Sequence, residues 1–168
     1  MLSLLLALVF PALMAYAAFS DLFTMRISNW LVIAVGAAYF VLALVTQLDW
    51  ALVGWASATA AAALAVAFVF FAFGWIGGGD AKLIAATVLW TGLALLLQYL
   101  IYAALLGGAL TLIILLLRRY PLPPRLASQA WLDRLHNPKT GVPYGIALAA
   151  AAILVYPQTA IFTRLMSL

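Results

Sequence analysis

Residues 76–83, IGGGDAKL, stand between two long apolar runs and decide how the chain is divided. Three consecutive glycines precede Asp80, one of the four acidic residues of the chain, and Lys82 follows two positions later. An aspartate suits the first turn of a helix, where the unpaired N–H groups favour negative charge. The stretch therefore predicts that one helix ends before Gly77, that the next begins near Ala81, and that a carboxyl group lies at the junction.

The composition is that of an integral membrane protein. Its 168 residues have a mean hydropathy of +1.21, and only 7% are charged, against about a quarter in soluble domains. Without cysteine, disulfides and thiolate metal sites are excluded, and the single histidine, His136, excludes multi-histidine metal sites. We therefore expect no metal and no cofactor. We also expect no nucleic-acid partner, because a net charge of +4 in a membrane protein is typical of cytoplasmic anchoring.

Six apolar segments approach the roughly 20 residues that a transmembrane helix needs. We therefore expect an all-α bundle of six transmembrane helices, forming one domain over residues 1–168. The segments are 2–20, 30–47, 51–73, 81–98, 99–117 and 143–162, with Pro11 as a kink in the first and Pro157 near the end of the last. The connections are short except for a loop over 118–142, in which Ser128 is expected to cap a short helix that runs to about His136.

The basic residues predict the orientation in the membrane. Six helices place both termini on one side, and seven of the eight basic residues then fall on the opposite side. The excess of Lys and Arg marks the cytoplasmic side, so both termini should lie outside. The seven are Arg26, Lys82, Arg118, Arg119, Arg125, Arg134 and Lys139, and the eighth is Arg164.

The same topology pairs two carboxylates. Asp21 closes the first helix and Asp80 opens the fourth, so both should lie at the cytoplasmic face. Two carboxylates that share a site do not both ionise easily, and one proton is then shared between them. The ionised member can take a proton from water that attacks a peptide carbonyl, and the protonated member can stabilise the oxyanion. Gly77, Gly78 and Gly79 would let a substrate backbone approach closely.

Each of these residues also has a plain structural interpretation. An aspartate at a helix N-terminus is a common cap, and Lys82 can extend its amine to the membrane interface. We interpret Asp49 as a turn or cap residue, Asp133 as a surface charge and His136 as a solvated loop residue.

Three motifs in order resemble one family of membrane enzymes. Gly77-x-Gly79-Asp80-x-Lys82-Leu83 resembles the Gly-x-Gly-Asp segment of the type 4 prepilin peptidases, which are aspartic intramembrane peptidases. Asp21, followed by Arg26-Ile27-Ser28-Asn29, resembles that family's Asp and Arg-Ile-Pro-Asn, with Ser28 in place of proline. Pro143-Tyr144-Gly145 resembles the Pro-Tyr-Gly that begins its last helix. The three motifs together cover most of the chain.

The resemblance implies a function and a site. The protein would be an aspartic endopeptidase of the bacterial inner membrane that removes the basic leader of prepilins or pseudopilins at the cytoplasmic face. Asp21 and Asp80 would be its catalytic dyad, and the substrate's apolar helix would pack against the enzyme within the bilayer. The residues expected to shape the site are Arg26, Asn29, Gly77, Gly78, Gly79, Lys82, Pro143, Tyr144 and Gly145.

The chain also differs from the larger members of that family. The cytoplasmic domain with a cysteine zinc motif, which carries N-methylating activity in the bifunctional enzymes, has no counterpart here. The chain resembles the short kind associated with tight-adherence (Flp-type) pili, and archaeal preflagellin peptidases are close relatives. Two alternatives remain at this point: a non-enzymatic assembly factor of a pilus or secretion system, and a small proton-coupled transporter that uses Asp21 and Asp80 as a relay.

Overall fold

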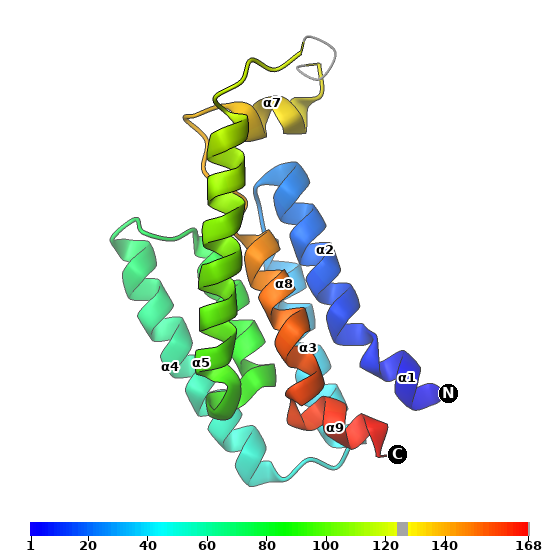
Figure 1. The fold of residues 1–168 in the computed structure, drawn as a ribbon. Coiled ribbons are helices and arrows are strands. Elements are labelled where there is room, and N and C mark those ends of the chain that lie inside the picture. The colour runs from blue at the N-terminus through cyan, green and yellow to red at the C-terminus, as the bar shows by residue number, and fades with distance from the viewer. Residues whose placement is uncertain (124–127, 168) are drawn as a thin grey trace.

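The computed structural model describes residues 1–123 and 128–167, and this part of the chain is helical, with no strand among the residues described (Figure 1). The predicted all-α class is confirmed. The helices are α1 (Leu2–Ala7), α2 (Val9–Thr24), α3 (Asn29–Val45), α4 (Trp50–Ala72), α5 (Gly78–Leu117), α7 (Ala130–His136), α8 (Gly145–Val155), the 3₁₀ turn η1 (Tyr156–Gln158) and α9 (Ala160–Met166).

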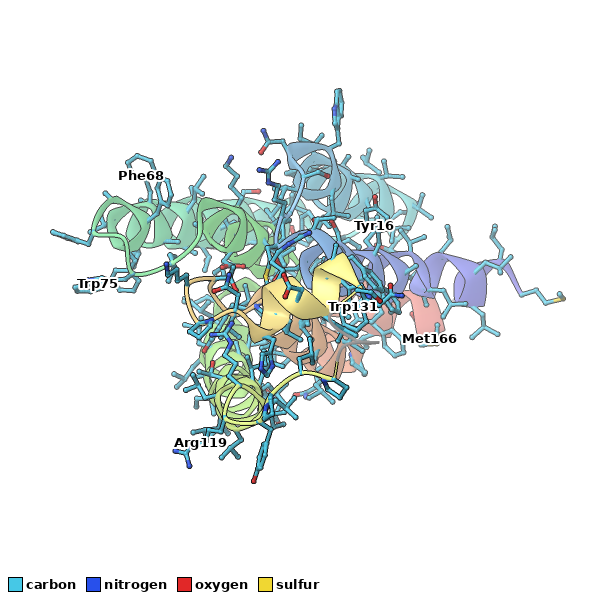
Figure 2. All side chains as sticks on the ribbon, turned by 90° about the horizontal axis from the view of Figure 1, so that it is seen from above. Tyr16, Phe68, Trp75, Arg119, Trp131 and Met166 are labelled. Atoms are coloured by element: carbon cyan, nitrogen blue, oxygen red, sulfur yellow. The ribbon has the colours of Figure 1, made fainter. Side chains whose placement is uncertain are left out.

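Three helical stretches are long and apolar enough to cross a membrane, namely Leu2–Thr24, Trp50–Ala72 and Gly78–Leu117. A fourth arises if α8, η1 and α9 form one span, which bends by 50° before α9. Viewed from above, Phe68 and Trp75 project outward from the α4 end of the bundle, as side chains in contact with lipid do (Figure 2). The chain is thus a membrane protein, and the count of six crossings stays a prediction.

α5 is broken at Gly92, where φ is 58° and ψ is −170°. Beyond this glycine the helix turns back on itself, at the lower end of the molecule in Figure 1. The Tyr99 phenol accordingly lies near Thr87, although a straight helix would hold the two residues about 18 Å apart. The expected boundary between 81–98 and 99–117 is therefore wrong, because Gly92 supplies a backbone conformation that is open almost only to glycine.

Proline and capping residues move two other helix boundaries. Pro11 cannot donate a hydrogen bond to the turn before it, and the first span is interrupted at Leu8, between α1 and α2. That span continues past Ser20 to Thr24, so Asp21 lies within its last turns. The last segment is not one helix over 143–162, because Pro157 introduces η1 and Thr159 then caps a separate α9.

Two polar side chains begin the helices that flank α5. The Ser28 hydroxyl accepts a hydrogen bond from the Leu31 amide at 3.2 Å and caps α3. The Asp49 carboxylate accepts one from the Ala51 amide at 2.9 Å and caps α4, as the sequence predicted. Serine at position 28 therefore performs a capping role that proline could not.

In the core, aromatic side chains from α2, α5 and η1 are in contact. The Phe10 ring lies 4.4 Å from Trp90 and 4.9 Å from Tyr156, measured between ring centroids. The Trp90 indole N–H also donates to the Val35 carbonyl at 3.1 Å, which ties α5 to α3. These contacts fix the first arm of α5 against α2, so the residues that begin α5 are held near the residues that end α2.

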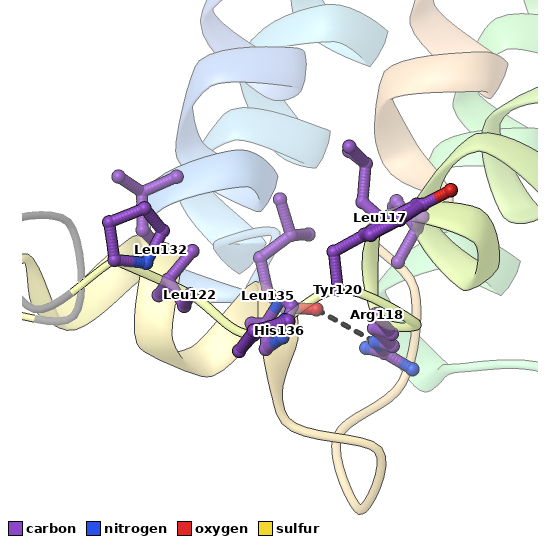
Figure 3. A pocket seen from close by; sticks show the side chains of 10 residues that line it. Leu117, Arg118, Tyr120, Leu122, Leu132, Leu135 and His136 are labelled. Carbon is purple, nitrogen blue, oxygen red and sulfur yellow. Dashed lines mark hydrogen bonds between the residues drawn. The ribbon is translucent and has the colours of Figure 1, made fainter.

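Residues 128–142, the described part of the loop that precedes α8, are folded onto the end of α5. The Arg118 guanidinium donates to the carbonyl of Leu135 at 2.9 Å (Figure 3). It also donates to the carbonyls of Thr140 and Gly141, at 3.2 and 3.0 Å. The predicted short helix is present as α7, although Gln129, not Ser128, is its N-cap, and the Gln129 side chain makes no capping hydrogen bond. Both termini lie at the end of the molecule opposite α7 (Figure 1).

Candidate active site

A cavity of about 670 Å³ lies between the end of α2, the turn that follows it and the start of α5. It brings together residues from two of the three motifs that the sequence singled out. Both candidate catalytic residues are among them. The motif residues that line it are Asp21, Arg26, Ile27, Ser28, Asn29, Gly77, Gly78, Gly79 and Asp80.

Asp21 is held by the third motif. Its side chain is only 6% exposed, and its Oδ2 accepts a hydrogen bond from the Gly145 amide at 2.7 Å. Helix α2 ends three residues later at Thr24, and its C-cap Met25 adopts a left-handed conformation that turns the chain back toward α3. Gly145 begins α8, so Asp21 also satisfies one of the amides that a helix N-terminus leaves without a partner.

Asp80 belongs to the first turn of α5, whose N-cap is Gly77. Its carboxyl turns back toward Gly77, which is its backbone hydrogen-bonding partner. This is the geometry in which an acidic or amide side chain at the third helical position reaches the amide of the N-cap. A Cβ at position 77 would lie 2.9 Å from Oδ2 of Asp80, so glycine there leaves room for the carboxyl.

The two carboxyl groups are close enough to interact electrostatically. Two ionised carboxylates in one cavity repel each other, so the arrangement disfavours a state in which both are ionised, and the shared proton stays a prediction. Within residues 1–123 and 128–167, no three His, Cys, Asp or Glu side chains come together as a metal site would need. The chemistry that these residues offer at this cavity is that of a pair of carboxyl groups.

Ile27 joins the glycines of two motifs, and sequence reasoning did not single it out. A Cβ at Gly79 would lie 3.2 Å from the Ile27 Cβ, and a Cβ at Gly145 would lie 2.9 Å from its Cδ1. The start of α5 and the start of α8 therefore both pack closely on this side chain. Its position within the Arg26-Ile27-Ser28-Asn29 motif was the signal that could have identified it.

Gly78 also makes room for a neighbour within the chain. A Cβ at this position would lie 3.2 Å from the ring of Phe71, near the end of α4. The glycines were expected to admit a substrate backbone, and that role stays a prediction. Their contacts show that they also allow α5 to start close to α4 and to the turn after α2.

Three hydrogen bonds fix the turn between α2 and α3. The Lys82 ammonium donates to the Asn29 side-chain oxygen at 2.9 Å, which ties the first turns of α5 and α3 together. The Arg26 carbonyl accepts hydrogen bonds from Ser20 at 2.8 Å and from Thr24 at 3.2 Å. Arg26, Asn29 and Lys82 thus lie around the predicted dyad, and the Lys82 side chain is engaged with a neighbour.

Pro143 and Tyr144, which directly precede Gly145, are tightly packed. Pro143 is fully buried, and Tyr144 packs on Gly107 so closely that a Cβ there would lie 2.1 Å from the phenol oxygen. Only a glycine at position 107 leaves space for this ring. Neither Pro143 nor Tyr144 lines the dyad cavity, and their site-shaping role stays a prediction.

α7 lies against the end of α2 on the same side of the molecule. The Arg134 guanidinium donates to the Phe23 carbonyl at 3.1 Å, and the Trp131 and Phe23 rings meet edge to face at 5.4 Å. Asp133 is exposed, and His136 lies near Arg118 at the end of α5 (Figure 3). Neither residue lies at the dyad cavity.

Comparison with known protein families identifies the family of this chain. Residues 8–112, more than half of the chain, match the model of the type IV leader peptidase family. The chain belongs to the type IV leader peptidase family. The resemblance to type 4 prepilin peptidases is thereby confirmed, and the protein is a membrane-bound peptidase, a hydrolase. No curated protein and no solved structure matches the chain.

The matched segment of this leader peptidase contains most of the predicted site residues, namely Asp21, Arg26, Asn29, Gly77, Gly78, Gly79, Asp80 and Lys82. It ends before Pro143, Tyr144 and Gly145. The link between this last motif and the site comes instead from the 2.7 Å hydrogen bond between Gly145 and Asp21.

Proposed function

We propose that this leader peptidase is an aspartic endopeptidase that removes the basic leader from prepilins or pseudopilins. The observation that carries the proposal is that Asp21 and Asp80 line one cavity at adjacent helix ends, close enough to interact electrostatically. In a chain with four acidic residues, the other two, Asp49 and Asp133, line no part of that cavity.

Hydrolysis by this pair follows from its shared proton. The ionised carboxylate takes a proton from a water molecule while the water oxygen attacks the carbon of the scissile carbonyl. The protonated carboxyl donates its hydrogen bond to the oxygen that becomes negative. When the C–N bond breaks, the proton taken from water passes to the departing amine, and the pair returns to its starting state with one proton.

The surroundings of the cavity support a cytoplasmic active site. Ser20, Thr24, Arg26 and Asn29 give its rim a polar character, which an interface with water accommodates. The basic residues predicted to be cytoplasmic include Arg118 and Arg134, which lie at the α7 end of the molecule, opposite both termini. We take these charges as anchors to the cytoplasmic leaflet of the inner membrane, not as contacts for the leader.

The family favours a peptidase over an assembly factor or a proton-coupled transporter. A transporter relay usually places its acids near the middle of the membrane, whereas Asp21 and Asp80 lie in the last turns of α2 and the first turn of α5. The substrate we propose is a prepilin of the tight-adherence type, with a basic leader followed by an apolar helix.

Co-expression with such a prepilin tests the proposal directly. Leader removal is followed by the change in prepilin size on a gel. Asp21→Asn and Asp80→Asn should each abolish processing while the protein still inserts in the membrane. Asp49→Asn is the matched control, because asparagine caps a helix as well as aspartate does and α4 keeps its N-cap. Processing by either dyad variant at the wild-type rate would overturn the proposed mechanism.

A further inference from the structure

A row of three cavities follows the first arm of α5, from the dyad cavity to the break at Gly92. The second cavity, about 260 Å³, lies among α3, α4 and α5, and the third, about 580 Å³, continues from it toward Gly92. Leu89 lines both of these cavities. Lys82 lines the second and is hydrogen-bonded to Asn29, which lines the first. The row extends about 18 Å along the helix axis.

Helices α3 and α4 both pack on α5, but they make far fewer contacts with each other, which leaves the space that these cavities occupy. The first arm of α5 is therefore the floor of a groove, and α3 and α4 are its two walls. Five of the nine residues that line its middle part have small side chains, which let the backbone of another helix come close. These are Gly36 from α3, Ala60 and Ala61 from α4, and Ala85 and Ala86 from α5.

A buried hydroxyl in the third cavity lacks a partner. Thr91 is only 6% exposed, and its Oγ1 makes no hydrogen bond. Other threonines in these helices, such as Thr46 and Thr111, each donate to the carbonyl four residues earlier. Thr91 does not do so beside the break at Gly92, and it lines the groove. The Oγ1 atom itself is closed off from the cavity, so an occupant of the groove would pair with it only after the Thr91 side chain turned, and the assignment below does not depend on it.

From this geometry we infer that the groove between α3 and α4 binds the apolar transmembrane helix of the substrate. The inference rests on the proposed peptidase function. A leader that is cut beside Asp21 and Asp80 is followed directly by the apolar helix, which must continue from that cavity into the membrane. The groove begins at the same cavity, at the Asn29–Lys82 pair, and it runs in that direction.

A helix suits this groove better than a lipid chain does. The small residues of its middle part remove the side-chain bulk that would keep two helix backbones apart. Ala61 and Leu64 of α4 are exposed at its edge, so an incoming helix can reach it sideways from the bilayer. The lipid chain remains the alternative occupant that an experiment must distinguish.

Site-specific photocross-linking measures what occupies the groove. Ala61 and the neighbouring Ala62 are replaced one at a time by benzoylphenylalanine in the full-length protein carrying Asp21→Asn. Both positions are exposed on α4, but Ala62 lines none of the three cavities. Each variant is irradiated in membranes that contain a tight-adherence prepilin. We expect a covalent prepilin adduct from position 61 and several-fold less from position 62.

Processing kinetics provide the second measurement. Ala61→Phe fills the groove without removing a buried contact, so KM for the full prepilin should rise by about tenfold with kcat unchanged. A soluble peptide that contains the leader and the cleavage site but lacks the apolar helix should be cut at the wild-type rate. Ala62→Phe is the matched control and should leave both substrates unaffected.

The outcomes separate the two proposals. If the wild-type protein does not cut the prepilin, the proposed function fails and the groove assignment fails with it. If the wild-type protein cuts, but position 61 yields only lipid adducts or Ala61→Phe leaves KM unchanged, the groove assignment alone is wrong. Equal prepilin adducts from positions 61 and 62 would also contradict it.

Discussion

The Gly145 amide donates a 2.7 Å hydrogen bond to Oδ2 of Asp21, across 124 positions of sequence. This contact joins the end of α2 to the start of α8 at the dyad cavity. It restrains Asp21 on one side, while α5 brings Asp80 to the other side. The relative placement of the two carboxyls therefore depends on backbone positions that are not themselves chemical groups of the reaction.

Gly145→Ala should impair processing strongly. The added Cβ would lie 2.8 Å from Oδ2 of Asp21 and 2.9 Å from Cδ1 of Ile27, so the carboxyl must move. A displacement of about 1 Å can cost on the order of a hundredfold in rate. Leader removal from a prepilin measures the effect. Gly141→Ala is the control, because no atom lies within 4 Å of its added Cβ, and equal activity of the two variants would contradict the positioning role.

Gly107→Ala should reduce activity through Tyr144, although residue 107 does not line the dyad cavity. Its Cβ would lie 2.1 Å from the phenol of Tyr144, which would have to leave its position next to Gly145. Overpacking of this kind costs about 1–3 kcal/mol, so both thermal stability in detergent and the processing rate should fall. Gly108→Ala meets open space and should leave the activity unchanged. Wild-type processing by Gly107→Ala would show that Tyr144 does not position the site.

Gly92→Ala should destabilise the fold. With φ at 58° and ψ at −170°, residue 92 occupies a region that an alanine enters only at a cost of about 1–3 kcal/mol. Unfolding in detergent measures the change in free energy. Gly54→Ala in α4, where φ is helical and the added Cβ meets open space, should be neutral or slightly stabilising. If Gly92→Ala is as stable as Gly54→Ala, the break in α5 does not require glycine.

The sequence was sufficient to predict that Asp21 and Asp80 lie on one face of the bundle, because helix parity places the end of the first span and the start of α5 on the same side. Parity does not determine whether the two residues are adjacent, which depends on how the helices pack. It could not predict the contact between Gly145 and Asp21, which depends on how α8 packs. The ring of Tyr144, the N-cap of α8, fits against Gly107 of α5. Nothing in the sequence around either residue predicts that the two are in contact. Apolar length alone predicts a break near Gln98, whereas the backbone freedom of the glycine at position 92 determines where α5 breaks.

The pH dependence of processing should be bell-shaped. The chemistry needs one ionised carboxyl as base and one protonated carboxyl as hydrogen-bond donor. At low pH both become protonated and no base remains, whereas at high pH both ionise and no donor remains. Initial rates of leader removal in detergent, with pH varied at fixed salt, measure the profile. The control Asp133→Asn removes an exposed carboxyl and should keep the same shape. A rate that rises to a plateau without falling would contradict a shared proton.

The central claim is that Asp21 and Asp80 act as one unit, and a double-mutant cycle on the processing rate tests it most directly. Residues of one catalytic unit are strongly non-additive, so Asp21→Asn, Asp80→Asn and the double variant should all lose activity to a similar extent, on the order of 10³-fold or more. The opposite result would be a single variant that retains substantial activity, or a double variant whose loss equals the product of two independent losses. Either would mean that the two carboxyls do not share the reaction.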